Sequence, residues 1–307
     1  MSLKTAVKKN RMLVAAYRKC RAAKYNLATR ISPKLNTAMR YKKAFGRKWD
    51  PQNPKTLNDK VLWLKFNTYW NNPLVRQCAD KYRVREYVER IGCKELLNEL
   101  IAVYERVEDI RFDELPDSFA LKLNVGCGYN LIVPDKSKLD VEQAKRQIKK
   151  WMKEKYHLAF SEMQYKGVKP YILVEKYLSS EKGGLPEDYK FYCFNGEASY
   201  VMVCTDRQEG GKQARFWYYN SDWEMQMLTS DALRYGKEAT IEKPKGIDEA
   251  FEYARKLSKG FPFVRVDFYI VDGKVIFGEM TFTPSGGFDN ERLKETDELL
   301  GSFVKLG

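Results

Sequence analysis

The sequence predicts an α+β protein in which antiparallel β-hairpins alternate with helices. Residues 263–284 alternate apolar and polar side chains on both sides of Asp272-Gly273, as a half-buried strand pair does. Residues 188–206 predict a second hairpin, which turns at Asn195-Gly196, a strong signal for a two-residue turn. Helices are expected over 140–156, which is rich in lysine, and over 247–259.

Further elements are expected ahead of these hairpins. Asn53-Pro54 and Asn72-Pro73 bracket an amphipathic helix over 57–70. Asp80 is expected to cap a helix that runs through Ile91 and stops at Gly92. Strands are expected at 100–104, on both sides of a glycine loop within 119–133, and at 170–178. Residues 207–240 are expected to be irregular, with an aromatic patch at 216–219.

The turn of the C-terminal hairpin decides whether two carboxylates meet. A two-residue loop would put Asp267 and Glu279 on opposite faces of the hairpin. A three-residue loop over 271–273, with Gly273 as a left-handed bulge, pairs Arg265 with Glu279 and puts Asp267 diagonally opposite on the same face. We favour the second register because only it satisfies the apolar alternation. It predicts a polar face that suits Mg²⁺, which takes one or two carboxylates plus substrate phosphates. The alternative is a surface cross-strand salt bridge.

Composition limits the class of protein. The chain has 307 residues, of which 44% are hydrophobic, enough for a large core in one multi-part domain or two. Six cysteines without a CxxC pair indicate reduced thiols of a cytoplasmic protein. The single histidine, His157, argues against histidine-based triads and metal sites. No signal peptide is visible and no run approaches the ~20 apolar residues of a membrane span.

The positive charge is concentrated at the N-terminus. The net charge is +14, and residues 1–50 hold fifteen Lys or Arg and one acid, so the remainder is neutral. A basic helical arm of this kind predicts an anionic partner. One reading is an interfacial helix over 3–25 on anionic lipid, at the inner face of the membrane. The other is a solvated basic helix packed on the domain. The neutral main body argues against a nucleic-acid partner.

The glycine loop is a candidate phosphate site. Asn124-Val-Gly126-Cys-Gly128 lies between two predicted strands, and no GxxxxGK[ST] motif exists in the chain. Together with Lys122, the loop could fold over a polyphosphate and offer backbone N–H groups and an ammonium as donors. The alternative is an ordinary hairpin turn.

In their order along the chain, these motifs resemble the ATP-grasp superfamily, whose fold holds ATP between two α+β subdomains. The order is Lys81, Lys122 with its glycine loop, the segment 174–178, Lys190, Arg265-Val-Asp267 and Glu279-Met-Thr281. More narrowly, residues 79–88, 114–122, 188–196 and 261–267 look like the TupA-like ATP-grasp family of teichuronopeptide and capsular polysaccharide synthesis. The resemblance runs from about residue 40 to the C-terminus.

The resemblance implies a set of nucleotide contacts. Lys81, Lys122 and the glycines Gly126 and Gly128 would contact the phosphates of ATP. Glu175 would take the adenine amino group, with Lys176 and Leu178 offering backbone contacts.

It also implies how the reacting groups would be held. Lys190 would contact the phosphates or the reacting carboxylate, and Arg265 would stabilise the developing negative charge. Asp267 and Glu279 would hold Mg²⁺. Thr281 stands where many members of the superfamily have Asn, and its hydroxyl is a weaker ligand for a second metal ion.

The implied activity is that of a carboxylate–amine ligase, which forms an amide through an acyl phosphate. Its substrates would be a small amine or amino acid and an acceptor carboxylate, that of a uronic acid or an amino acid in an anionic cell-surface glycan or polymer. The aromatic and cationic segment 206–219 is a candidate acceptor surface, or else a folded core loop. Two alternatives are a sugar or hydroxyl kinase on the same fold and a non-catalytic protein that binds acidic glycans.

The resemblance further implies a division of the chain. Residues 1–50 would form the basic arm and 51–118 a helical region ahead of the grasp. Residues 119–178 would form the lid subdomain, and 179–307 the C-terminal subdomain with the metal-binding hairpin.

Overall fold

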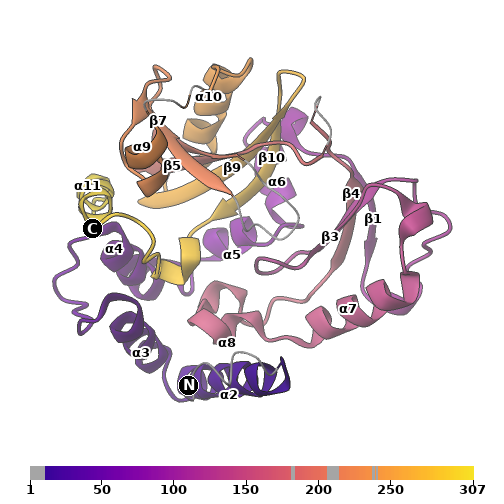
Figure 1. The fold of residues 1–307 in the computed structure, drawn as a ribbon, viewed down its shortest axis with the longest axis horizontal. Helices are drawn as coiled ribbons and strands as arrows, with labels where there is room; N and C mark the ends of the chain where they lie inside the picture. Colours follow the sequence, from indigo (N-terminus) through magenta and orange to yellow (C-terminus); the bar gives the residue numbers. More distant parts are fainter. Residues whose placement is uncertain (1–10, 181–183, 206–213, 237–238, 240) are drawn as a thin grey trace.

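Two antiparallel sheets carry the fold of the computed structural model, which describes residues 11–180, 184–205, 214–236, 239 and 241–307 (Figure 1). The smaller sheet has the strand order β1-β4-β2-β3, and the larger has the order β10-β9-β5-β6-β7-β8. The predicted α+β class is therefore confirmed. Within the described ranges, no helix has the length and apolarity that crossing a membrane requires.

The small sheet packs against a helix. Its strands are β1 (Leu100–Tyr104), β2 (Phe119–Leu123), β3 (Asn130–Val133) and β4 (Ile172–Lys176). Helix α7 (Val141–Lys153) contributes Ala144 and Ile148 to the same buried cluster as Phe119 and Val174. β1 pairs with β4, so this sheet takes in a strand from the segment 51–118.

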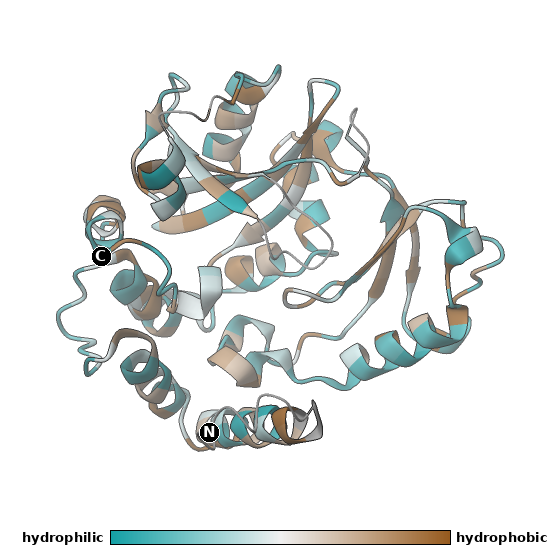
Figure 2. Cartoon of the chain, viewed as in Figure 1, coloured by the Kyte–Doolittle hydropathy of each residue, from teal (hydrophilic) through white to brown (hydrophobic). Residues whose placement is uncertain are grey.

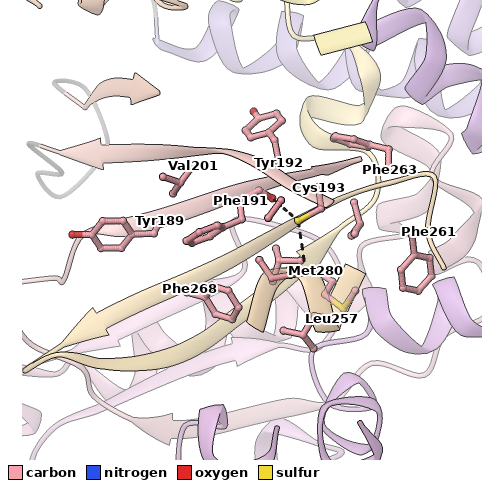
Figure 3. Packing of buried hydrophobic residues seen from close by; sticks show 14 of the residues in the cluster. Tyr189, Phe191, Tyr192, Cys193, Val201, Leu257, Phe261, Phe263, Phe268 and Met280 are labelled. Atoms are coloured by element: carbon pink, nitrogen blue, oxygen red, sulfur yellow. Dashed lines mark hydrogen bonds between the residues drawn. The ribbon is translucent and has the colours of Figure 1, made fainter. Parts of the chain in front are cut away.

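The large sheet lies on a core of aromatic side chains. Its strands are β5 (Asp188–Phe194), β6 (Glu197–Thr205), β7 (Arg215–Tyr219), β8 (Met225–Gln226), β9 (Phe263–Val271) and β10 (Lys274–Thr281). Phe191 and Phe268 of neighbouring strands pack edge to face, with ring centroids 5.4 Å apart (Figure 3). Helix α10 (Ile247–Ser258) covers this core with Phe251 and Leu257. Along these strands, hydrophobic and hydrophilic residues are mixed, as Figure 2 shows.

Helices fill the space around the two sheets. They are α2 (Arg11–Ile31), α3 (Pro33–Phe45), α4 (Leu57–Leu64), α5 (Pro73–Ala79), α6 (Val84–Arg90), α8 (Tyr156–Phe160), α9 (Ser230–Tyr235) and α11 (Lys294–Phe303). A π-helical turn, η1 (Lys65–Tyr69), continues α4. Short 3₁₀ turns lie at Lys94–Leu96, Val107–Asp109, Lys136–Lys138, Met163–Tyr165 and Pro284–Gly287.

The C-terminal half of the basic region packs on the rest of the protein. The buried Thr29 hydroxyl donates to the carbonyl of Leu158 in α8 at 2.7 Å, and Asn36 of α3 donates to Ser161 at 3.1 Å. The packed helix that we left open as an alternative is therefore observed for this part of the chain. Residues 1–10, where the predicted interfacial helix begins, lie outside the described ranges.

The predicted turn of the β9–β10 hairpin is wrong. Val271 pairs with Lys274, so the loop is the two-residue Asp272-Gly273, and both residues have positive φ. The extra residue lies further along, at Gly278: Phe277 pairs with Phe268, but Glu279 pairs with Asp267. This bulge moves Glu279 onto the face of Asp267. A Cβ at Gly278 would lie 2.8 Å from the Asp267 carbonyl oxygen, so the close approach requires glycine.

Two further expectations need correction. Arg215–Tyr219 forms β7 rather than an irregular segment, and Trp217, Tyr218 and Tyr219 are buried. These aromatics therefore belong to the core and not to an acceptor surface; Arg207 lies outside the described residues. Asp80 caps a turn, because its Oδ1 accepts from the backbone N–H of Tyr82 and Arg83, and the helix itself begins only at Val84.

A buried lysine ties three segments together. Lys65, 1% exposed, donates to the carbonyl of Phe160 in α8 and to that of Gly286 after β10. Burial lowers the pKa of Lys65 to about 8. The charged form is therefore less favourable in the folded chain than in the unfolded chain.

The lowered pKa of Lys65 leads us to expect that the free energy of unfolding rises at alkaline pH. Between about pH 8 and 10, an unfolded chain with an ordinary lysine binds more protons than the folded chain, so the unfolding free energy should increase, by at most about 1.4 kcal/mol per pH unit. Urea unfolding of the wild type and Lys65→Met from pH 8 to 9.5 should give a smaller slope for the variant. The exposed Lys259→Met should keep the wild-type slope. Equal slopes in all three proteins would contradict the prediction.

Candidate active site

A cavity of about 190 Å³ lies between the small and the large sheet. The glycine loop forms one wall, and strands β5, β9 and β10 form the other. Seven residues singled out in the sequence line it: Lys81, Lys122, Gly126, Gly128, Lys190, Asp267 and Glu279. The structure thus brings residues from five separate segments of the sequence together around one space.

The polar face of the β9–β10 hairpin forms the charged wall. Asp267 lies opposite Glu279, and Arg265 lies opposite Thr281. Arg265 binds both oxygens of Asp267, with Nε–Oδ1 at 2.7 Å and Nη2–Oδ2 at 2.6 Å, and its Nη2 lies 3.6 Å from Glu279 Oε1. The Thr281 hydroxyl donates to the same Oε1 at 2.8 Å. The predicted convergence is observed. Asp267 is only 4% exposed, which excludes the surface salt bridge considered as the alternative.

Two lysines complete this network. Lys190 of β5 lies next to Asp267 in register, with Nζ 3.1 Å from Oδ2, and it also binds Asp188. Lys81 Nζ lies 2.9 Å from Glu279 Oε2. We did not predict Asp188. The alternation Asp188-Tyr-Lys190 was an available signal, because it puts both side chains on one face of a strand.

The charges around the two carboxylates affect them differently. Burial alone would raise the pKa of Glu279, but Lys81 and Arg265 lower it far below the ordinary value. Burial raises the pKa of Asp267, against the lowering effect of Arg265 and Lys190. Glu279 is therefore the more firmly ionised of the pair.

The small sheet contributes a further ion pair. Lys122 Nζ of β2 lies 2.6 Å from Glu175 Oε2 of β4. Lys176 and Leu178, at the end of β4, do not reach the cavity. They line a separate hollow of about 480 Å³, together with Val271, Asp272 and residues 274–276 of the hairpin.

The glycine loop is anchored by a residue that the sequence analysis did not single out for a role. Asn124 is fully buried; its Nδ2 donates to Asp80 Oδ2 at 2.8 Å, and its carbonyl accepts from the Lys81 N–H at 2.8 Å. Gly126 has φ +75°, and a Cβ there would lie 2.4 Å from the ring of Tyr156. The loop therefore has a fixed shape that depends on glycine.

The donor set of the hairpin fits a hard cation. In the described residues no three His, Cys, Asp or Glu side chains group into a metal site. The hairpin instead offers two facing carboxylates and the Thr281 hydroxyl. Such a set suits Mg²⁺, which keeps waters and phosphates as its remaining ligands, and it lacks the nitrogen and sulfur ligands typical of zinc.

Comparison with known proteins identifies a family. The family model described as TupA-like ATPgrasp matches residues 59–305. No curated protein matches the chain in sequence.

Solved structures give weaker similarities. D-alanine–D-alanine ligase from Bacillus anthracis is 17% identical, over 74% of this chain and 63% of that one, with a TM-score of 0.42. A second structure of that ligase, complexed with ATP, is 15% identical over 74% and 65%, with a TM-score of 0.43. L-amino acid ligase from Bacillus licheniformis is 12% identical over 75% and 49%, with a TM-score of 0.46. The chain spans less than two thirds of the length of these ligases.

Proposed function

The chain belongs to the TupA-like ATP-grasp family, and from this premise we propose that it is an ATP-dependent ligase that joins a carboxylate to an amine. One observation carries the proposal. Asp267 and Glu279 face each other in a cavity that also receives Lys81, Lys122 and Lys190. Lysines and paired carboxylates suit a nucleotide polyphosphate that arrives with a metal ion.

The reaction needs positioning and charge neutralisation more than proton transfer. A substrate carboxylate would attack the γ-phosphate and release ADP. The amine nitrogen would then attack the acyl carbon of the resulting acyl phosphate, release inorganic phosphate and lose a proton. Lys81, Lys122 and Lys190 would hold the phosphoryl oxygens, and Arg265 would offset the negative charge as it develops. Mg²⁺ held by Asp267 and Glu279 would polarise the phosphoryl group. None of these roles requires a histidine.

Nucleotide binding would exchange partners within the cavity. In the structure each lysine of the cavity is paired with a carboxylate. We infer that the phosphates would take over the lysines while the metal takes over the carboxylates. A volume of about 190 Å³ is below the roughly 300–1,000 Å³ of small-molecule sites, so the two walls would also have to separate. The adenine would occupy the hollow at Lys176 and Leu178, close to Glu175.

The first fifty residues are proposed to contact an anionic surface. Helix α2 exposes Leu27 (59%) and Ile31 (70%) beside the exposed Arg30, a combination that suits anionic lipid.

Calorimetry with a non-hydrolysable ATP analogue tests the nucleotide site. We expect binding by the wild type that depends on Mg²⁺ and weakens at least tenfold in Glu279→Gln, because the variant loses a charged metal ligand. The exposed Glu298→Gln serves as the control and should bind like the wild type. Absence of binding by the wild type, or equal binding with and without Mg²⁺, would remove the proposal.

Hydroxylamine trapping separates the ligase from a hydroxyl kinase on the same fold. Only an acyl phosphate reacts with hydroxylamine to give a hydroxamate. With ATP and a uronic acid we expect hydroxamate to form in step with ADP. ADP and a phosphorylated sugar without hydroxamate would instead identify a kinase.

Sedimentation with vesicles tests the lipid surface. Wild type and Leu233→Asp, a change at an exposed leucine of α9, should sediment with phosphatidylserine vesicles and not with phosphatidylcholine vesicles. The double variant Leu27→Asp/Ile31→Asp should stay in solution, because two charges are costly at a lipid interface. Equal behaviour of both variants would refute this use of α2.

A further inference from the structure

A groove of about 730 Å³ lies beside the cavity and plays no part in nucleotide binding as proposed above. It is lined by the junction of α2 and α3 (29–33) and, more than a hundred residues later, by two neighbouring segments, the end of α7 with α8 (152–158) and residues 163–170. Trp70 and Val125 complete it. Its volume lies within the usual range of small-molecule sites.

Tyr156 separates this groove from the nucleotide cavity. Its side chain lines the groove, its ring lies against Gly126, and its hydroxyl donates to Cys127 Sγ at 3.1 Å. Gly126 and Cys127 line the nucleotide cavity, whereas the preceding Val125 lines the groove. The two spaces thus lie on opposite sides of one loop, the loop expected to hold the phosphates.

The rim of the groove is cationic. Arg30, Lys153, Lys155 and Lys166 line it, and all four are exposed. Its one acidic side chain, Glu154, accepts from the Tyr129 hydroxyl at 2.7 Å. Within the part of the chain that the structure describes, none of the four cations forms an ion pair, unlike the lysines of the nucleotide cavity.

The histidine at the groove reflects the same charge. Burial lowers the pKa of His157, and the positive charges of Lys166, Lys155 and Arg30 lower it further. A lowered pKa disfavours the charged form of His157, so the positive charge of the groove comes from its three lysines and Arg30, against the single carboxylate of Glu154.

The floor of the groove is apolar and partly aromatic. Trp70, Tyr156, Tyr165, Met152 and Met163 line it, and Trp70 and Tyr165 are partly exposed. A sugar ring can lie on such side chains with its C–H face while its carboxylate reaches the cationic rim, since ammonium and guanidinium groups bind carboxylates strongly. A flat lipid surface would not enter a concave site.

We propose that this groove binds the carboxylate substrate, an anionic glycan that bears uronic acids, and directs a carboxylate past Tyr156 to the phosphates. The assignment rests on the proposed ligase function. Charge decides between the two substrates: a carboxylate is attracted to the four cations of the rim, whereas a protonated amine is repelled by them and enters by another route.

Calorimetry with a hexamer of galacturonic acid tests the groove. The wild type should bind the hexamer, and its uncharged methyl ester should bind at least tenfold more weakly. Lys153→Glu/Lys166→Glu should weaken binding of the acid at least tenfold. Trp70→Ala should weaken binding of both forms, because it removes part of the floor.

A matched pair of lysines controls for the change in net charge. Lys259 lies directly after the last residue of α10, and Lys153 is the last residue of α7. Lys259 and Lys305 are both exposed and lie near the turn at 195–196, and neither lines the groove. Lys259→Glu/Lys305→Glu should bind the hexamer like the wild type. Equal weakening in both double variants would overturn the groove assignment. The assignment would also be overturned if a single-stranded oligonucleotide of equal charge bound as tightly as the hexamer and its binding depended on Lys153 and Lys166.

Binding of the ATP analogue, measured on the same proteins, separates the two proposals. The groove variants should keep Mg²⁺-dependent nucleotide binding, which also shows that they are folded. Nucleotide binding without hexamer binding in the wild type would overturn the groove alone. Hexamer binding that depends on Lys153 and Lys166, in a protein that binds no nucleotide, would overturn the ligase and leave an anionic-glycan site.

Discussion

The ion pair of Lys81 joins the two sheets at the cavity. Its Nζ lies 2.9 Å from Glu279 of the large sheet and donates to the Gly126 carbonyl, at the end of the small sheet, at 2.6 Å. Its own backbone is fixed by Asn124, which Asp80 holds in turn. Coulomb attraction is stronger where water is scarce, and the bond to Gly126 helps to offset the cost of desolvating the ammonium. Lys81 therefore joins the glycine loop directly to a carboxylate of the hairpin.

The balance of charges in the cavity constrains how a ligand can enter. Lys81, Lys190 and Arg265 share the carboxylates Asp267 and Glu279, so removing one cation leaves a buried carboxylate with one counter-charge instead of two. Losing all counter-charge of a buried ion costs about 3–5 kcal/mol, and losing part of it costs less. A phosphate that took a lysine without a cation for the released carboxylate would meet this cost. The arrangement favours ligands that bring both charges together, as a nucleotide with its metal ion does.

Local signals predicted much of this fold, and contacts between distant segments account for most of what was missed. The Asn195-Gly196 turn is confirmed, because the positive φ values that it needs are intrinsic to those residues. The position of the extra residue in the last hairpin was predicted wrongly. Asp267 and Glu279 share a face only if one strand contains one extra residue, and either Gly273 or Gly278 could be that residue. The aromatic run 216–219 could be a surface or a core by composition alone, and its pairing with β6 decides the matter. Lys65 and the groove consist of contacts between segments that no local pattern connects.

The bulge at Gly278 divides β10 into two halves, and the alternation of buried and polar side chains changes its phase between them. Before the bulge, Val275 and Phe277 are buried in the core. After it, Glu279 and Thr281 lie on the polar face of the hairpin, and Met280 is again buried in the core. Losing that one residue would turn the second half over, so that Met280 faced the cavity and Glu279 entered the core. The number of residues in this strand is thus more tightly constrained than the identity of most of its side chains. Insertions and deletions should be tolerated least between Phe277 and Glu279.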